Sequence, residues 1–235
     1  WKMTFIVLAI LTGVSLVGAL LLQETLPAKE RTQSTTIQTI LGLRKVAKNP
    51  NFSSLLLVGA FISAPFMAYL ALASYIYIDG FGVSETTFSM YFASNAATSI
   101  LGPVMYMRFG AGSVKKVINV GIIVAIISAI LILTVGNASP IIFLLSYVLY
   151  AVMTSYFRPL ISDLLLSATK TDVGATSSVM NFGFTVIGSI GMVVGSLQWS
   201  SYTGGLGITM LIFIALTTAV WLYLLKARSI QFDWK

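Results

Sequence analysis

Two charged residues lie within the apolar stretches of this sequence, and they are its first candidates for functional chemistry. Arg158 and Asp163 stand five residues apart in one long apolar stretch. That spacing puts the two side chains on different faces of a helix, so no direct pair within the helix is expected. They could serve gating or coupling, or extend their charges to the cytoplasmic surface.

The amino-acid composition excludes most catalytic and metal-binding chemistry. The sequence has no cysteine and no histidine, which excludes disulfides, thiolate chemistry and histidine-ligated metals or triads. It has no glycine-rich phosphate loop, no embedded carboxylate pair and no nucleophile with a base partner. We therefore expect no enzymatic activity and no cofactor.

Polar and aromatic residues at mid-span form a second group of candidates. Pro65 would free a backbone carbonyl inside an apolar helix, and Phe66 and Tyr69 follow it. Such breaks are common where transporters bind substrate, although a packing kink is an equal alternative. Asn95 carries an amide that is costly to leave unpaired in hydrocarbon, so it either contacts substrate or bonds between helices.

Long apolar helices must position these residues. Hydrophobic residues make up 57% of the 235 and charged residues 9%, a balance that gives no polar shell for a soluble fold. About 20 apolar residues span a bilayer. Seven such spans are predicted, at 3–23, 54–78, 86–106, 115–136, 140–163, 173–198 and 205–226. The predicted fold class is an all-α, polytopic transmembrane helical bundle.

Basic residues indicate the orientation of the spans. Thirteen of the 14 lysines and arginines fall in the linker 24–53 or at the same side of the later spans, and Lys2 alone falls opposite. The positive-inside rule puts that linker and the C-terminus in the cytoplasm. Topology thus explains the net charge of +7, and no nucleic-acid partner is expected. Ile37, Ile40 and Leu41 recur at helical spacing in the linker, which fits either a membrane-surface helix or a solvated one.

Small residues mark one predicted helix-packing face. Gly188, Gly191 and Gly195 lie at spacings of three and four in the sixth span, and the last two form a G-x-x-x-G. Glycine lets helix backbones approach closely in a membrane. We expect these positions to contact another helix, with no bearing on substrate.

Several strings together resemble one transporter family. Glu24-Thr25-Leu26-Pro27 resembles the end of the sixth helix in bacterial drug:proton antiporters of the major facilitator superfamily. The string from Tyr75 to Glu85, with the later Tyr91-Phe92-Ala93-Ser94-Asn95, is similar to the seventh-to-eighth helix region of the Bcr/CflA subfamily. Gly174 to Val179 resembles the start of its eleventh helix, and Arg108-Phe109-Gly110 looks like the R-x-G core of the signature loop.

The resemblance implies a domain plan. Residues 1–23 would be the last helix of the N-terminal half, 24–53 the cytoplasmic linker, and 54–235 the C-terminal six-helix domain. The first residue, Trp1, enters an apolar stretch without a signal-peptide cleavage site, so residues upstream are expected to be missing. The missing N-terminal half would then be a partner, together with membrane lipid.

The resemblance also implies a function. It suggests proton-driven export of small drug-like or amphipathic molecules by alternating access, as in multidrug efflux and antibiotic resistance, in a bacterial inner membrane. Helices seven and ten would face the cavity with eight and eleven beside them. The candidate substrate contacts are then Phe66, Met67, Tyr69, Asn95, Tyr147, Tyr150, Met153 and Asn181. Candidates for gating or coupling are Arg108, Gly110, Arg158 and Asp163.

Departures from the family pattern leave alternatives. Met107 stands where an acidic residue usually precedes R-x-G, and Ala111 replaces the following basic residue. The family's proton-coupling acid belongs to the N-terminal half. We therefore expect the present chain to supply substrate surface and the missing half to supply proton coupling. A seven-helix membrane receptor or a non-transporting scaffold is the alternative function.

Overall fold

The computed structural model describes residues 2–22, 36–110, 112–168 and 173–227, and within them it contains helices and no strands. The chain divides into two compact units, Trp1–Gln38 and Thr39–Lys235. In the first unit, α1 (Lys2–Leu20) is apolar around its whole circumference. Its 19 residues extend about 29 Å at 1.5 Å per residue, enough to cross a bilayer.

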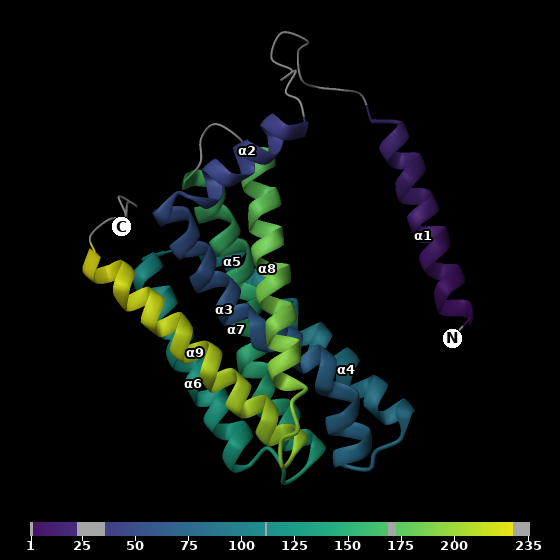
Figure 1. Ribbon diagram of the computed structural model, residues 1–235. Coiled ribbons are helices and arrows are strands. Elements are labelled where there is room, and N and C mark those ends of the chain that lie inside the picture. The colour runs from purple at the N-terminus through teal and green to yellow at the C-terminus, as the bar shows by residue number, and fades with distance from the viewer. Residues whose placement is uncertain (1, 23–35, 111, 169–172, 228–235) are drawn as a thin grey trace. The chain divides into compact units, whose positions relative to one another are not determined.

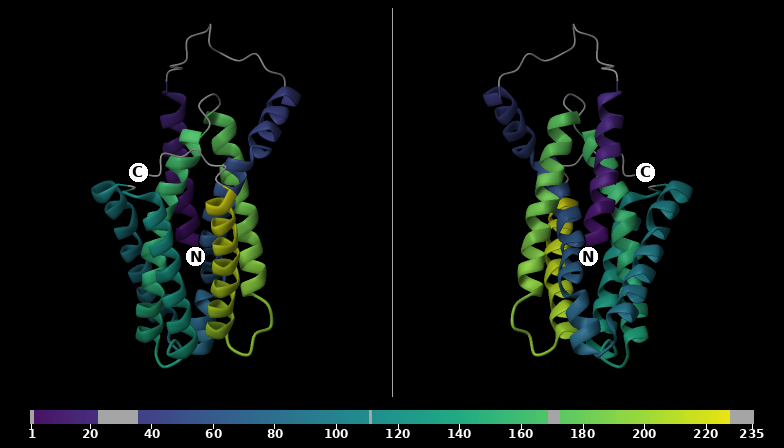
Figure 2. Two further views of the ribbon diagram at one scale, coloured as in Figure 1. Left: turned by 90° about the vertical axis from the view of Figure 1, so that its left-hand side faces the viewer. Right: turned by 90° about the vertical axis from the view of Figure 1, so that its right-hand side faces the viewer.

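The second unit is a helical bundle (Figure 1). After α2 (Thr36–Ala47), which crosses the boundary between the units, come α3 (Pro50–Ser74), the π-helical turn η1 (Tyr75–Gly80), α4 (Glu85–Ser99), α5 (Leu101–Phe109), α6 (Val114–Thr134), α7 (Pro140–Ala168), α8 (Val173–Gly195) and α9 (Tyr202–Ala227). The side chains of Ile37, Ile40 and Leu41 in α2 lie outside the described part. The loops 81–84, 135–139 and 196–201 share one end of the bundle (Figure 2). Successive spans therefore alternate in direction.

Six described helices are long and apolar enough to cross a membrane: α1, α3 with η1, α6, α7, α8 and α9. Asn49 caps α3 by accepting from the backbone N–H of Asn51, and Pro50 occupies the first helical position, where a missing N–H costs nothing. The predicted spans thus correspond to helices, and α3 with η1 extends beyond the predicted 54–78.

The predicted span 86–106 differs, because it is broken into α4 and α5 at Ile100. Pro103 lies four residues after Ser99, and a proline ring clashes with the carbonyl at that distance and gives no hydrogen bond. Together α4 and α5 still cover 85–109, which is 25 residues and long enough to span a bilayer.

The packing of the bundle is centred on α3, which contacts α7, α8 and α9 (Figure 1). The helix backbones approach closely where α8 crosses α3. A Cβ placed on Gly191 would lie 2.5 Å from the carbonyl oxygen of Ala64. α6 lies against α7 and α9, and α5 against α7.

The exposed surface of α6 is apolar, which shows that this surface faces lipid and not water. Ile118, Ala125 and Ile132 are buried on its inner side, whereas Val120, Ile123, Ile127 and Ile130 form an apolar stripe that is about half exposed. Such a stripe is unfavourable in water and is compatible with lipid, so the bundle is that of an integral membrane protein.

Candidate functional site

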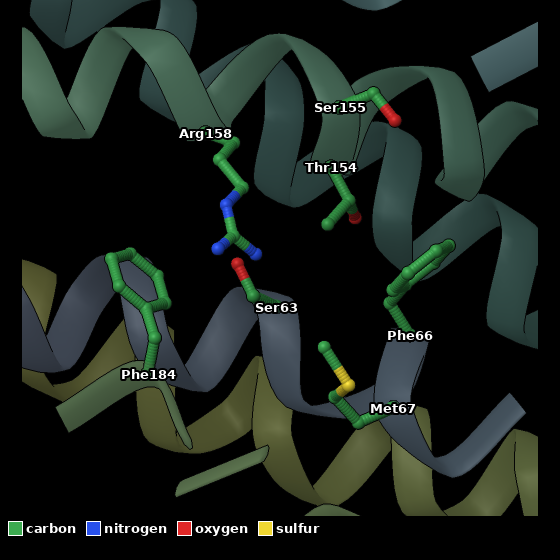
Figure 3. A pocket seen from close by; sticks show the side chains of 7 residues that line it. All are labelled: Ser63, Phe66, Met67, Thr154, Ser155, Arg158 and Phe184. Carbon is green, nitrogen blue, oxygen red and sulfur yellow. The ribbon is translucent and has the colours of Figure 1, made fainter. Parts of the chain in front are cut away.

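A pocket of about 60 Å³ lies between α3, α7 and α8. On α3 and on α7 its residues recur at helical spacing, which puts them on one face of each of these helices. They are Ser63, Phe66 and Met67 from α3, Thr154, Ser155 and Arg158 from α7, and Phe184 from α8 (Figure 3). The wall therefore combines aromatic and thioether surface with three hydroxyl groups and one guanidinium.

The pocket lies near the middle of the helices that form it. Ser63 is the fourteenth of the 31 residues from Pro50 to Gly80, and Phe184 is the twelfth of the 23 residues of α8. Arg158 precedes the end of α7 at Ala168 by ten residues, or about 15 Å of helix. Substrate sites of secondary transporters lie at this depth, near the bilayer midplane.

The Arg158 side chain extends across the pocket. Figure 3 shows its guanidinium extending from α7 toward Ser63, with Phe184 on one side and Met67 on the other. The guanidinium carbon lies 5.3 Å from the centre of the Phe184 ring, within range of a cation–π contact. This direction differs from the cytoplasmic one that the sequence left open, because the side chain reaches α3 and α8.

Buried aromatic rings fill the bundle beside the pocket. The rings of Tyr69 and Tyr147 stack with centroids 4.0 Å apart, and both side chains are fully buried. Phe92 stacks on Tyr69 at 6.2 Å, which joins α4 to the cluster. Tyr150 donates to the carbonyl oxygen of Ile62, in the helical turn that precedes Pro65. The cluster fixes α3, α4 and α7 against one another.

Several polar atoms in this interior have no partner among the described residues. They include the hydroxyl groups of Tyr69, Tyr77 and Tyr147 and the side-chain oxygen of Asn95. Asn95 is 3% exposed and follows Phe92 by three residues, so it faces the cluster from α4. Buried polar groups are usually hydrogen-bonded, so these atoms are candidates for bound water or ligand.

Of the eight predicted substrate contacts, only Phe66 and Met67 line the pocket. Four lie in or face the buried aromatic cluster beside it, namely Tyr69, Asn95, Tyr147 and Tyr150. The remaining two lie elsewhere. Met153 lines a separate apolar groove of about 330 Å³ with Phe109, Lys116 and Tyr156, among residues of α5, α6 and α7. Asn181 is exposed on α8, and its amide donates to the carbonyl oxygen of Ser177 at 3.0 Å. Within the second unit, neither residue contributes to the pocket wall.

The gating candidates fall into separate groups. The carbonyl oxygen of Gly110 accepts from the Tyr156 hydroxyl at 2.6 Å, and Asp163 accepts from the Tyr106 hydroxyl at 3.1 Å. These bonds join α5 and the turn after it to α7. Gly110 has a φ of +65°, a conformation that favours glycine. Arg108 is exposed at the end of α5 and belongs to neither bond.

The three glycines predicted to pack lie against α3. A Cβ on Gly188 would be 2.9 Å from Cγ of Met67, and one on Gly195 would be 2.9 Å from Cβ of Ala68. Since Met67 lines the pocket, Gly188 packs directly behind one wall of it. The position of α8 and the shape of the pocket are therefore linked.

Sequence reasoning missed four residues of the pocket wall: Ser63, Thr154, Ser155 and Phe184. The available signal was spacing, because Thr154 and Arg158 stand four apart, as do Ser63 and Met67. That spacing predicts that Thr154 and Arg158 lie on the same face of α7. Among the described residues, Arg158 is the one charged residue that lines the pocket.

The fold and the pocket define a polytopic α-helical membrane protein with a pocket near the middle of its helices. The family model described as Major Facilitator Superfamily matches residues 1–192, and the chain belongs to that superfamily. The chain is also similar to the "Uncharacterized MFS-type transporter YdgK" of Bacillus subtilis (strain 168), with 31% identity over 137 residues. The match covers 57% of this chain and 34% of that protein, so the chain spans about a third of the relative's length.

Proposed function

We propose that this chain is helices six to twelve of a proton-coupled exporter of small amphipathic molecules, of the Bcr/CflA type, in a bacterial inner membrane. The observation that carries the proposal is the mid-depth pocket between α3, α7 and α8. Alternating access in this superfamily rocks two halves about such a central site. The present half supplies one wall, and the missing N-terminal half supplies the other.

The chemistry of the wall suits varied substrates. Phe66 and Met67 are only partly buried, so they offer apolar surface to a ligand. A thioether chain adapts its shape at low cost, and promiscuous binding surfaces use methionine for that reason. The Ser63 hydroxyl donates to the carbonyl oxygen of Gly59 at 2.7 Å, so its oxygen can still accept a hydrogen bond from a ligand without fixing one substrate.

The orientation of the bundle in the membrane follows from the charges. Arg108, Lys115, Lys116 and Lys226 belong to one end of the bundle, and Asp79 and Glu85 to the other. By the positive-inside rule the basic end faces the cytoplasm. The pocket then opens alternately to the cytoplasm and to the outside.

Proton coupling is assigned to the missing half. Asp163 is the one described carboxylate in the half of the bundle at the basic end, and Tyr106 already donates to it at 3.1 Å. Asp163→Asn keeps a side-chain oxygen for that bond, so transport is expected to remain within about threefold of wild type. Loss of transport in this variant, with expression intact, would show that Asp163 takes part in proton coupling. That result would contradict the assignment of coupling to the N-terminal half.

Efflux of a neutral fluorescent amphipath tests the proposal. Cells that lack their main exporters and express the complete reading frame should extrude N-phenyl-1-naphthylamine, and a protonophore should abolish this. Phe66→Ala should reduce efflux at least several-fold, since it removes a pocket wall. Tyr223→Ala, which removes an exposed aromatic side chain from α9, should not.

The outcomes separate the candidate functions. Efflux that persists with the protonophore would contradict proton coupling. If the complete protein extrudes neither this dye nor chloramphenicol, although it reaches the membrane, the exporter proposal fails and a receptor or scaffold role is favoured. Equal effects of Phe66→Ala and Tyr223→Ala would show that the pocket does not form the transport path.

A further inference from the structure

Arg158 puts a permanent positive charge in the pocket wall. An arginine guanidinium is not deprotonated in proteins, so the charge persists at any working pH. The residue lies about 15 Å from the cytoplasmic end of α7 at 1.5 Å per residue, and its side chain is exposed toward the pocket. A charge at this depth is costly unless it has a partner or faces a water-filled cavity.

The described carboxylates do not neutralise this charge. Asp79 and Glu85 belong to the opposite end of the bundle. Asp163 lies five residues after Arg158, about 140° further around α7, and accepts from Tyr106 on α5. Among the described residues, the guanidinium has the Phe184 ring at 5.3 Å as its charge-stabilising contact. A ring quadrupole offsets only part of the cost of an arginine.

Polar and apolar side chains surround the guanidinium. Ser63 faces it from α3, Thr154 lines the pocket from the same helix as Arg158, and Phe66 and Met67 form the wall beyond (Figure 3). A guanidinium binds an oxyanion through two parallel N–H bonds, a geometry that a lysine cannot supply. The pocket therefore offers one site for an oxyanion and an adjoining surface for an apolar body.

We propose that the pocket binds amphipathic organic anions, with a single carboxylate, sulfonate or phosphate group on Arg158 and the apolar part against Phe66 and Met67. This inference rests on the proposed function for its role in export, and it names the class of substrate. The same pocket should discriminate against organic cations, because their charge would approach Arg158 without compensation.

A competing explanation is that a carboxylate outside the described residues pairs permanently with Arg158. In that case the arginine would hold two parts of the protein together, and an anionic ligand would gain nothing from it. The two explanations differ in what removal of the charge does to anionic and neutral ligands of the same shape.

Two dyes of one shape supply that comparison. 1-Anilinonaphthalene-8-sulfonate and N-phenyl-1-naphthylamine share their ring system, and only the first carries a sulfonate. Fluorescence titration would use the complete protein in phosphatidylcholine nanodiscs, with empty discs subtracted. The variants are Arg158→Gln and Arg158→Lys, with Lys226→Gln as a control that removes one exposed charge from the end of α9.

The expected result is selective. Arg158→Gln should weaken binding of the sulfonate about ten- to a hundredfold, the range for a charge-assisted contact, and leave the neutral dye within about twofold. Arg158→Lys should keep part of the sulfonate affinity, and Lys226→Gln all of it. Elution volume and melting temperature would confirm that each variant is folded. If Arg158→Gln does not fold, Arg158→Lys is used instead. A fall in its affinity for the sulfonate relative to the neutral dye supports an anion site, and an unchanged ratio supports a structural role for Arg158.

Other results would overturn the inference. Wild-type protein that binds both dyes equally has no anion site, and equal weakening of both by Arg158→Gln assigns the arginine a structural role. An unchanged ratio in Arg158→Lys would count against bidentate recognition. An efflux assay of Arg158→Gln cells with the neutral dye distinguishes these failures from a failure of the proposed function. The proposed function stands if that efflux persists, and it fails if wild type extrudes neither this dye nor chloramphenicol.

Discussion

The crossing of α8 over α3 supports a prediction that uses two glycines of the same helix. In Gly191→Ala the new Cβ would lie 2.5 Å from the carbonyl oxygen of Ala64 and 2.9 Å from its carbonyl carbon. These are backbone atoms, so they can move only if a helix moves. In Gly183→Ala the nearest atom is Cδ2 of Leu56 at 2.8 Å, the flexible end of a side chain. The substitution is identical, and only the obstacle differs.

The expected difference in unfolding free energy depends on which atoms the new methyl group meets. Both variants gain about 1 kcal/mol of helix propensity, so this contribution cancels in the comparison. At Gly191 the extra methyl group overpacks a helix crossing, which costs about 1–3 kcal/mol. At Gly183 a rotation of Leu56 relieves the contact at a cost of about 1 kcal/mol or less. Gly191→Ala should therefore be less stable than Gly183→Ala, by up to about 3 kcal/mol.

Thermal unfolding in detergent micelles measures this difference. Intrinsic fluorescence provides the signal, because the chain has four tryptophans and Trp221 is buried. For a protein of this size about 1 kcal/mol shifts the melting temperature by about 2–4 °C, so Gly191→Ala should melt below Gly183→Ala by up to about 12 °C. Equal melting temperatures would refute the reasoning, since the backbone contact at Gly191 would then have no special cost.

Three other substitutions test the interior of the bundle. Tyr147→Phe removes a buried hydroxyl that has no described partner, so it should leave stability unchanged or raise it by about 1 kcal/mol, as seen by melting temperature. Tyr150→Phe removes a hydroxyl that donates to the main chain of α3, so it should lower stability by about 1–2 kcal/mol; the reverse order would contradict the assigned partners. Asn119→Ala removes the 2.8 Å bond from the Trp221 indole and should cost about 1 kcal/mol and alter the tryptophan emission maximum; unchanged emission would contradict that contact.

The membrane-spanning helices could be predicted from sequence because the thickness of the bilayer sets their length and requires apolar residues. A helix that crosses hydrocarbon needs about 20 apolar residues, and α6 and α9 meet this requirement within a few residues of the predicted bounds. The break at Ile100 was not predicted, although Pro103 gave a signal for it. Composition reports how apolar a span is, and a single local clash hardly changes that average.

Membership of the pocket depended on helix rotation, which apolar composition does not report. Met153 and Thr154 are adjacent in sequence, yet one residue turns a helix by about 100°. Thr154 consequently faces the pocket, while Met153 faces the groove formed with α5 and α6. Chemical type alone favoured methionine as a substrate contact. The rotation of α7 is set by which of its residues pack on α3, α5 and α6, and those contacts are long-range.

The same rotation explains how α7 separates its two charges. A turn of about 140° between Arg158 and Asp163 points the first toward α3 and α8 and the second toward Tyr106 on α5. With a spacing of four, the two would have paired, and the pocket would have been electrically neutral. With five, the carboxylate holds α5 against α7, and the guanidinium is available to a ligand. Because Asp163 points toward α5, Arg158 has no counterion among the described residues. The sulfonate of the anionic dye is expected to act as that counterion.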